Sequence, residues 1–327
     1  ASSHWLLAWM GLEVNTLAII PIMAQQHHPR AVEATTKYFL TQATAAATLL
    51  FASTTNAWMT GEWGINCLSH PSAMTLATMA LALKVGLAPL HFWLPEVLQG
   101  LDLTTGLIMS TWQKLAPLAL LVQISPTMDP LTLTLLGLLS AIIGGWGGLN
   151  QTQLRKILAY SSIAHLGWMI IILQYAPQLT VLALGTYIIM TSTAFLTFKT
   201  TASTKINTLA LTWAKTPALT AMMVLTLLSL GGLPPLTGFM PKWLILQELT
   251  KQQLPLTATI MAMSALLSLY FYLRLCYAMT LTIAPNTNNA TTPWRLKSSQ
   301  TTLPLATLTT ATLTLLPLTP AITALMY

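Results

Sequence analysis

The sequence contains very few charged residues. Its 327 residues include 14 Lys or Arg and 7 Asp or Glu, so only 6% of the chain is charged, whereas a soluble domain carries about 25%. Hydrophobic residues make up 54% of the chain, and this balance excludes a water-soluble fold, a nucleic-acid-binding domain and a disordered chain. The formal net charge of +7 does not indicate an anionic partner, because the basic residues form no cluster. The composition is that of an integral membrane protein.

Cysteines and nucleotide-binding motifs are also scarce. Cys67 and Cys276 are the only cysteines, too few for a disulfide framework, an iron–sulfur cluster or a structural zinc site. The glycines within 144–148 lack the spacing of a dinucleotide-binding loop and favour close helix packing instead. We therefore expect no cofactor and no metal on this chain, and no means of carrying electrons.

The hydrophobic pattern predicts an all-α fold, a polytopic transmembrane helix bundle. A bilayer core needs about 20 apolar residues per helix, and ten segments qualify, joined by loops too short to hold a soluble catalytic domain. The ten segments are 4–24, 34–57, 73–95, 104–123, 130–149, 154–174, 178–198, 217–250, 256–280 and 302–325.

Two of these segments carry glycines and prolines near their centres. The third contains Gly86 and Pro89, and the eighth contains Gly231-Gly232 followed by Pro234-Pro235. Proline removes a backbone donor and clashes with the preceding turn. Irregular backbone is tolerated at membrane depth only where it is buried in protein or lines a polar cavity. The sequence therefore predicts two discontinuous helices with a polar interior beside them.

The basic residues between the segments predict an orientation. Counted over alternate loops, nine basic residues fall on one side of the membrane and only Lys251 on the other, which also holds Glu62 and Asp129. By the positive-inside rule this bias sets the topology, and an even number of spans puts both ends on the less basic side. The nine are Arg30, Lys37, Arg155, Lys156, Lys199, Lys205, Lys215, Arg295 and Lys297.

Three lysines and one carboxylate lie well inside the predicted spans: Glu13, Lys84, Lys114 and Lys242. A central charge costs at least about 2.5–3.5 kcal/mol on insertion scales, and intramembrane ionisable residues are functional by default. The alternative is a set of structural ion pairs. We expect Glu13 to pair with Lys84, because a carboxylate modulates the protonation of a nearby lysine.

For two histidines in the predicted spans, the sequence does not decide between a functional and a structural role. His165 lies at the centre of its segment and would serve as a relay between lysines, but a lone histidine is as often a hydrogen-bonded core residue. His91 follows the Pro89 break, where it would either line the same cavity as Lys84 or cap exposed carbonyls. Together, the titratable groups form a row across several helices, which favours proton movement within the membrane plane.

Four motifs carry a family resemblance: Trp9-Met-Gly-Leu-Glu13-Val-Asn15, the stretch 28–39, the stretch 84–96 and the stretch 231–239. They resemble NADH dehydrogenase subunit 2, the mitochondrially encoded, antiporter-like membrane subunit family of respiratory complex I, of vertebrate type. The resemblance runs over residues 1–327 as a single transmembrane domain. It implies that the family's first helix is missing, so the sequence is expected to be N-terminally incomplete.

The resemblance also implies roles for the intramembrane residues. Glu13 matches the carboxylate that pairs with Lys84 of the first broken helix. Lys114 matches the central lysine of the next helix, Lys242 the lysine of the second broken helix, and His165 the bridging group. The implied function is proton translocation across the mitochondrial inner membrane, coupled to electron transfer from NADH to ubiquinone in other subunits.

By the same resemblance, NADH, FMN, iron–sulfur clusters and ubiquinone are bound by other subunits of the complex. The expected partners are those subunits, including neighbouring antiporter-like subunits, and the lipid bilayer. We expect no nucleic acid, no homo-oligomer, and basic loops that face the matrix. Two alternatives stay open at this point: an Mrp-type cation/proton antiporter subunit, and a non-pumping membrane scaffold whose charges are inert.

Overall fold

The computed structural model describes residues 2–25, 27–282 and 302–326 of the chain. These ranges are helical and contain no strand, only two isolated bridges, His4–Gly64 and Gln153–Lys205. The all-α prediction is therefore confirmed. Lys297 and Arg295, two of the predicted orientation-setting residues, lie outside the described residues.

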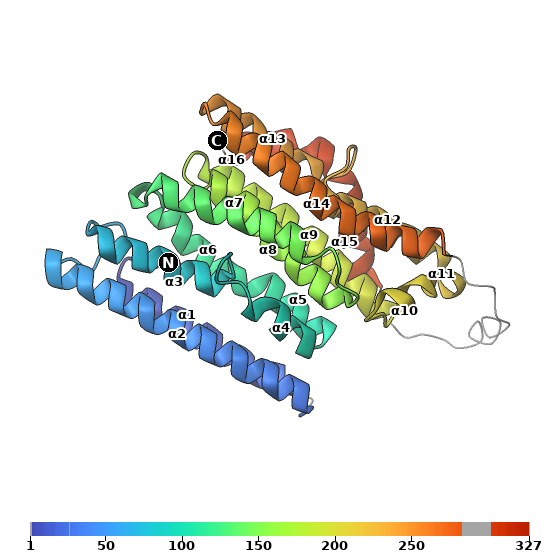
Figure 1. Ribbon diagram of the computed structural model, residues 1–327, viewed down its shortest axis with the longest axis horizontal. Helices are drawn as coiled ribbons and strands as arrows, with labels where there is room; N and C mark the ends of the chain where they lie inside the picture. The colour runs from blue at the N-terminus through green and yellow to red at the C-terminus, as the bar shows by residue number, and fades with distance from the viewer. Residues whose placement is uncertain (1, 26, 283–301, 327) are drawn as a thin grey trace.

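The helices run roughly parallel and antiparallel to one another in an elongated bundle (Figure 1). They are α1 Trp5–Ala24, α2 Pro29–Thr60, α3 Pro71–Val85, α4 Trp93–Gly100, α5 Leu103–Ser110, α6 Trp112–Ile124, α7 Pro130–Gly147, α8 Leu154–Ile172, α9 Pro177–Thr200, α10 Ile206–Ala210, α11 Thr212–Lys215, α12 Pro217–Gly231, α13 Phe239–Lys251, α14 Pro255–Thr280, α15 Leu303–Thr314 and α16 Thr319–Met326.

Each of the ten predicted segments coincides with one helix or with a consecutive pair of helices. By length and hydropathy alone, five spans of the described chain could cross a membrane, or six if the bent pair at the C-terminal end is one span. The others fall short because α3 and α12 are each 15 residues long. In addition, threonines lower the mean hydropathy of α2, and α8 carries Arg155 and Lys156 in its first turn.

Both predicted helix breaks are present, and they have the same design. Gly86 caps the end of α3 with a φ of 87°, and Gly232 caps the end of α12 with a φ of 81°. At each end two successive amides donate to one carbonyl: Gly86 and Leu87 to Ala82, and Gly232 and Leu233 to Leu228. Glycine is favoured here because other residues strain in the left-handed region.

A short shared sequence underlies this similarity. Residues 86–90 read Gly-Leu-Ala-Pro-Leu and residues 232–236 read Gly-Leu-Pro-Pro-Leu. In both, the glycine ends the first half of a helix and the proline that follows prevents its continuation. The second halves, α4 and α13, begin several residues later. The two breaks are a local internal repeat of the kind seen in transporters built from related halves.

The helix α8 occupies the middle of the bundle, with 15 of its 19 residues buried. It packs closely on α7, because a Cβ added at Gly144 would lie 2.6 Å from the Ala164 amide nitrogen. Likewise, a Cβ at Gly167 would lie 2.7 Å from the amide nitrogen of Ala141. The expectation of close packing at the glycines of 144–148 is thus confirmed for Gly144. Small residues let the two helix backbones approach each other closely, as in other membrane bundles.

Three features were not predicted. The fourth predicted segment is interrupted at Thr111, which separates α5 from α6. The last is bent by 65° between Leu303–Thr314 and Leu316–Ala324, at a turn that contains Pro317. Arg30 and Lys37, predicted as loop residues, lie inside α2, because that helix begins at Pro29.

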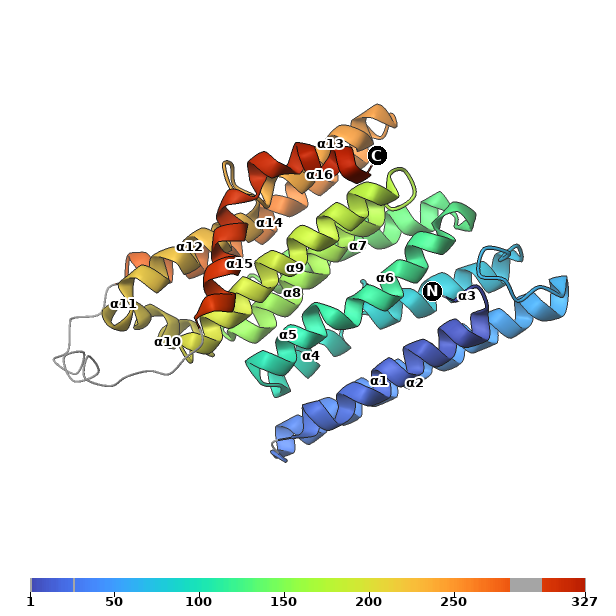
Figure 2. The ribbon, with the colours of Figure 1, turned by 180° about the vertical axis from the view of Figure 1, so that it is seen from behind.

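Several basic residues gather at one end of the bundle. Lys37 bridges Glu33 at 2.7 Å within α2 and Glu96 of α4 at 2.8 Å, and Arg155 of α8 donates to the Leu101 carbonyl. The same end holds α10 and α11 in both views (Figures 1 and 2). These contacts place basic residues from distant parts of the sequence on one side of the bundle.

Candidate functional site

The two broken helices each present a lysine at the end of a half-helix. Lys84 lies in the last turn of α3 and is 5% exposed. Lys242 belongs to α13, but its Nζ reaches back to the end of α12, 2.8 Å from the Gly231 carbonyl and 3.5 Å from that of Leu230. The carbonyl end of a helix carries a partial negative charge. Both breaks therefore favour a cation.

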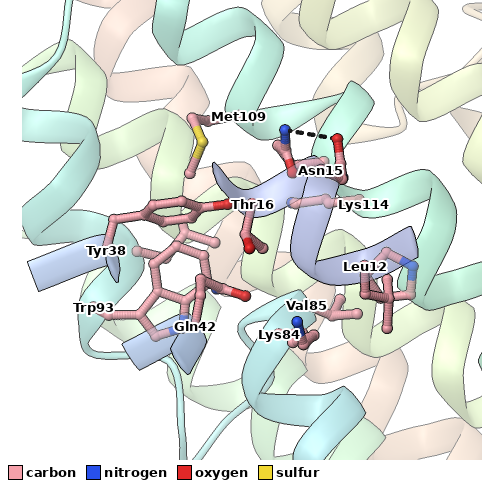
Figure 3. Close-up of a pocket in the computed structure, with 13 residues that line it drawn as sticks. Leu12, Asn15, Thr16, Tyr38, Gln42, Lys84, Val85, Trp93, Met109 and Lys114 are labelled. Carbon is pink, nitrogen blue, oxygen red and sulfur yellow. Dashed lines mark hydrogen bonds between the residues drawn. The ribbon is translucent and has the colours of Figure 1, made fainter. Parts of the chain in front are cut away.

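Lys84 and Lys114 line one internal cavity between α1, α2, α3 and α6 (Figure 3). The volume that the centre of a water molecule can occupy in this cavity is about 10 Å³, which is roughly the minimum for one bound water. Lys114 is 2% exposed and Gln42 is 4% exposed. The remaining polar lining comes from Asn15, Thr16, Tyr38 and Gln113. The cavity thus places two buried amines beside hydrogen-bonding groups.

An amide pair separates this cavity from the outside. Asn15 Nδ2 donates to Gln113 Oε1 at 2.8 Å, and Gln113 Nε2 donates back to Asn15 Oδ1 at 3.3 Å. The same two residues line an open groove of about 400 Å³ between α1 and α5–α6. The reciprocal pair therefore lies between the groove and the lysines.

Glu13 does not form the direct ion pair expected with Lys84. Among the described residues, no carboxylate lies within 4.0 Å of the Lys84 Nζ, and both that nitrogen and Glu13 Oε2 are buried without a hydrogen-bond partner. The two residues still interact through space, as Glu13 also does with the Tyr38 hydroxyl. Glu13 thus influences Lys84 by its charge and not by contact.

Tyr187 of α9, which the sequence did not single out, is the partner of Lys114. Lys114 Nζ donates to Tyr187 Oη at 3.1 Å, and Tyr187 Oη donates to the Ser110 carbonyl at 3.2 Å. The Tyr187 side chain is fully buried. A buried tyrosine hydroxyl generally requires a hydrogen-bond partner. A tyrosine within an apolar segment was therefore the signal in the sequence that could have drawn attention to Tyr187. Hydropathy alone could not identify the partner across 73 residues.

His165 of α8 lies between Lys114 and Lys242. Its ring is 5.5 Å from that of Tyr187 between centroids, and it interacts with both lysines and with the Leu230 carbonyl. That carbonyl is shared with Lys242, whose Nζ also lies 5.9 Å from the Trp168 ring centroid. The end of α12 thus joins His165 to Lys242.

The predicted residues therefore follow one another across the bundle. The order is Glu13 on α1, Lys84 on α3, Lys114 on α6, His165 on α8 and Lys242 on α13, with Tyr187 inserted after Lys114. Each of these residues belongs to a different helix, so the row crosses the helices instead of following one of them.

His91 does not join this row. It is 2% exposed, and its ring packs on Phe92 and on the edge of Tyr160. The residues that line the Lys84 cavity do not include it, so the suggestion that it shares that cavity was wrong. Within the described ranges no cluster of three His, Cys, Asp or Glu could hold a metal ion.

Comparisons with known proteins show which family the chain resembles. The profile of the family described as NADH:quinone oxidoreductase/Mrp antiporter, transmembrane, matches residues 2–268. The profile described as NADH dehydrogenase subunit 2 C-terminus matches residues 269–323. Together the two profiles cover residues 2–323.

Curated relatives carry one name. The chain is 76% identical to NADH-ubiquinone oxidoreductase chain 2 of Carassius auratus, over 99% of this chain and 93% of the relative. It is 71% identical to the protein of that name from Danio rerio, over 98% of this chain and 92% of the relative. These relatives distinguish the chain from a stand-alone antiporter.

Solved structures show the same architecture. A subunit of respiratory complex I from Thermus thermophilus matches with a TM-score of 0.87 at 29% identity, covering 98% of this chain and 75% of that one. The Mrp complex from Dietzia matches with a TM-score of 0.83 at 15% identity, covering 99% and 72%, and supports the fold alone. The chain belongs to the NADH-ubiquinone oxidoreductase chain 2 family, and it is a core membrane subunit of the proton-translocating respiratory complex I.

Proposed function

We propose that this subunit moves protons within the membrane plane through Glu13, Lys84, Lys114, His165 and Lys242. The observation that carries the proposal is the burial of Lys84 and Lys114 around one polar cavity. A buried charge needs compensation of several kcal/mol. Because no carboxylate in the described part of the chain contacts either amine, inert ion pairs do not account for them.

The arrangement suits an exchange of protons between neighbours. Lysine in an apolar environment can change its charge state more readily than in water. Lys84 and Lys114 share a space for about one water, and a water there would connect them by hydrogen bonds. Beyond Lys114, His165 and the Leu230 carbonyl continue the row to Lys242.

We further propose that residues 1–327 act as one transmembrane domain of the mitochondrial inner membrane, with the basic end towards the matrix. The support is the concentration of Lys37, Arg155 and their partners at that end together with the positive-inside rule. Lys242 is the last member of the row, and a neighbouring antiporter-like subunit would receive the proton beyond it. The bilayer is the remaining partner; neither nucleic acid nor a second copy of the chain is proposed.

The proposal also assigns no redox cofactor to this chain. Its two thiols, Cys67 and Cys276, lie apart, one exposed and one buried, and thiolate clusters are the usual ligands of iron–sulfur centres. NADH, FMN, iron–sulfur clusters and ubiquinone would then be bound elsewhere in the complex, and electron transfer there would drive this row.

Two substitutions test the proposal in the complete complex reconstituted into vesicles. Lys114→Met and Lys242→Met remove an ammonium group at nearly constant side-chain length. We expect each to lower the number of protons translocated per electron. Lys251→Met is the matched control, because Lys251 is exposed and pairs with Glu248 at 3.4 Å at the end of α13. An unchanged ratio in both variants would support a non-pumping scaffold instead.

The Na⁺ dependence of proton translocation tests the alternative that this chain acts as a cation/proton antiporter subunit. The similarity to the Mrp complex concerns the fold, and a cation antiporter would move Na⁺ against protons. We expect proton translocation by the complex to be independent of Na⁺. A dependence that disappears in Lys114→Met would favour the antiporter alternative.

A further inference from the structure

The helix interruption beside Lys114 creates an acceptor inside the bundle. In a regular helix the Lys114 amide would donate to the carbonyl four residues before it, that of Ser110. Here it donates to the Thr111 carbonyl at 3.3 Å instead, because Thr111 adopts φ −112° and ψ −68°. The Ser110 carbonyl is left for another donor, and a buried carbonyl without one is costly.

Tyr187 supplies that donor and contacts the Lys114 side chain as well. Its hydroxyl donates to the Ser110 carbonyl at 3.2 Å and accepts from Lys114 Nζ at 3.1 Å. A tyrosine hydroxyl has one proton to donate. It can satisfy the Ser110 carbonyl fully only while the Lys114 nitrogen acts as a donor, which an ammonium always does.

We propose that Tyr187 is a positioning residue that couples the charge of Lys114 to the α5–α6 interruption. When Lys114 is an ammonium, the chain Lys114–Tyr187–Ser110 is complete and holds the amine on the His165 side. When Lys114 has given up its proton, its amine competes with the Ser110 carbonyl for the hydroxyl proton. The interruption is then released, and the Lys114 amine is free to leave the Tyr187 hydroxyl and approach Lys84 across the cavity that both residues line.

This inference rests on the proposed function, and it assigns to Tyr187 the control of when Lys114 faces each neighbour. Other ionisable groups surround the pair: Lys84 across the cavity, Glu13 beyond it on α1, His165 on α8, Lys242 on α13 and Tyr272 on α14. Among the described residues, none of these groups lies within hydrogen-bond distance of the Lys114 amine, whereas Tyr187 does.

Tyr187→Phe tests the coupling, because it keeps the ring and removes the hydroxyl. A hydrogen bond to a charged group stabilises the charged form. Without the hydrogen bond from Lys114 to the Tyr187 hydroxyl, Lys114 holds its proton less well. We therefore expect the alkaline limb of the pH profile of NADH-driven proton pumping to move to lower pH by about one to two units. An artificial electron acceptor that bypasses the membrane arm measures how much assembled enzyme is present.

Tyr272→Phe is the matched control. Tyr272 is 1% exposed, and in the described chain its hydroxyl makes no hydrogen bond to Lys114 or to the Ser110 carbonyl, so its loss should leave the alkaline limb in place. An unchanged limb in Tyr187→Phe would overturn the coupling. It would leave the proposed function intact, since that depends on Lys114→Met and Lys242→Met.

A second measurement covers the case in which Tyr187→Phe does not assemble. In the complete complex, amide hydrogen exchange of the segment 108–116 reports opening of the interruption. After correction for the intrinsic pH dependence of exchange, we expect exchange in the wild type to become faster as the pH rises and Lys114 loses its proton. In Lys114→Met, which has no amine to compete for the hydroxyl proton, we expect no such acceleration. A wild type without this acceleration, or the same acceleration in Lys114→Met, would overturn the inference.

Discussion

The ammonium nitrogen of Lys242 lies 2.8 Å from the carbonyl oxygen of Gly231, the last residue of α12. Gly232 follows with a φ of 81°, and a Cβ there would lie 2.9 Å from Lys242 Cδ and 3.1 Å from Nζ. The glycine that ends the helix also leaves room for the lysine. Both the end of α12 and the position of the Lys242 ammonium group therefore depend on Gly232.

Gly232→Ala should displace Lys242 and reduce proton translocation per electron. A left-handed alanine costs roughly 1–2 kcal/mol, and the added methyl group would push the lysine side chain from the Gly231 carbonyl. Pumping in reconstituted vesicles is the measurement.

Gly185→Ala is the control for that substitution. Gly185 lies within α9, where the described chain leaves open space for an added Cβ, and alanine is favoured over glycine in a helix by about 0.8–1.0 kcal/mol. It should pump like the wild type. If Gly232→Ala also does so, the position of Lys242 against the helix end is not important for pumping.

Glu13→Gln should slow NADH:quinone turnover of the whole complex. The carboxylate interacts electrostatically with Lys84 without touching it, and its loss raises the free-energy cost of the charged amine in a low-dielectric site. Steady-state turnover tests this, with Glu62→Gln in the exposed loop after α2 as the control. Wild-type turnover in Glu13→Gln would contradict an electrostatic role for Glu13.

Cys67 should report the orientation of the subunit. It is exposed in the segment between α2 and α3, at the end opposite the basic residues, whereas Cys276 is buried. A membrane-impermeant maleimide should label Cys67 from the intermembrane-space side only, as detected by mass spectrometry of this chain. Labelling from the matrix side would reverse the proposed topology.

The pH dependence of that labelling should reflect Glu62. A hydrogen bond and the negative charge of Glu62 raise the pKa of the Cys67 thiol above its usual value. Since only the thiolate reacts, labelling should be slower near neutral pH than for an ordinary thiol and should accelerate as the pH rises. Glu62→Gln should lower the pKa and speed the reaction at neutral pH; equal rates would contradict the interaction.

Asn15→Ala should destabilise the packing of α1 on α6. The substitution removes both hydrogen bonds of the amide pair and leaves the half-buried Gln113 side chain without them, at a cost of about 1–3 kcal/mol. Thermal inactivation of the solubilised complex should occur at a lower temperature. Asn66→Ala, in the exposed loop, is the control, and identical inactivation temperatures would count against the pair.

Much of the architecture could be predicted from the sequence because it depends on local properties. Runs of apolar residues identified the helices, and the prolines after Gly86 and Gly232 identified the breaks. Pro317 lies in a comparable position, yet the 65° bend there was not predicted. A single proline near the end of a hydrophobic segment does not distinguish a bend from a helix terminus.

The functional site was harder to predict from the sequence than the fold. Charge in an apolar segment is conspicuous, so Lys84 and Lys114 were found, but the direction in which Glu13 points was not. Tyr187 was missed because tyrosine in an apolar helix is ordinary, and its contact with the Ser110 carbonyl arises from the interruption at Thr111, between α5 and α6.

The sequence by itself determined that this protein lies in a membrane, where its helices break and which charges the membrane must accommodate. These follow from the free energy of transferring single residues and from the conformational limits of glycine and proline. Only the tertiary structure decided which groups face one another: Lys114 with Tyr187, Lys242 with Gly231, and Asn15 with Gln113. The rotation of each helix about its axis is set by packing against neighbours distant in sequence, and that rotation decides which of the buried groups contact one another.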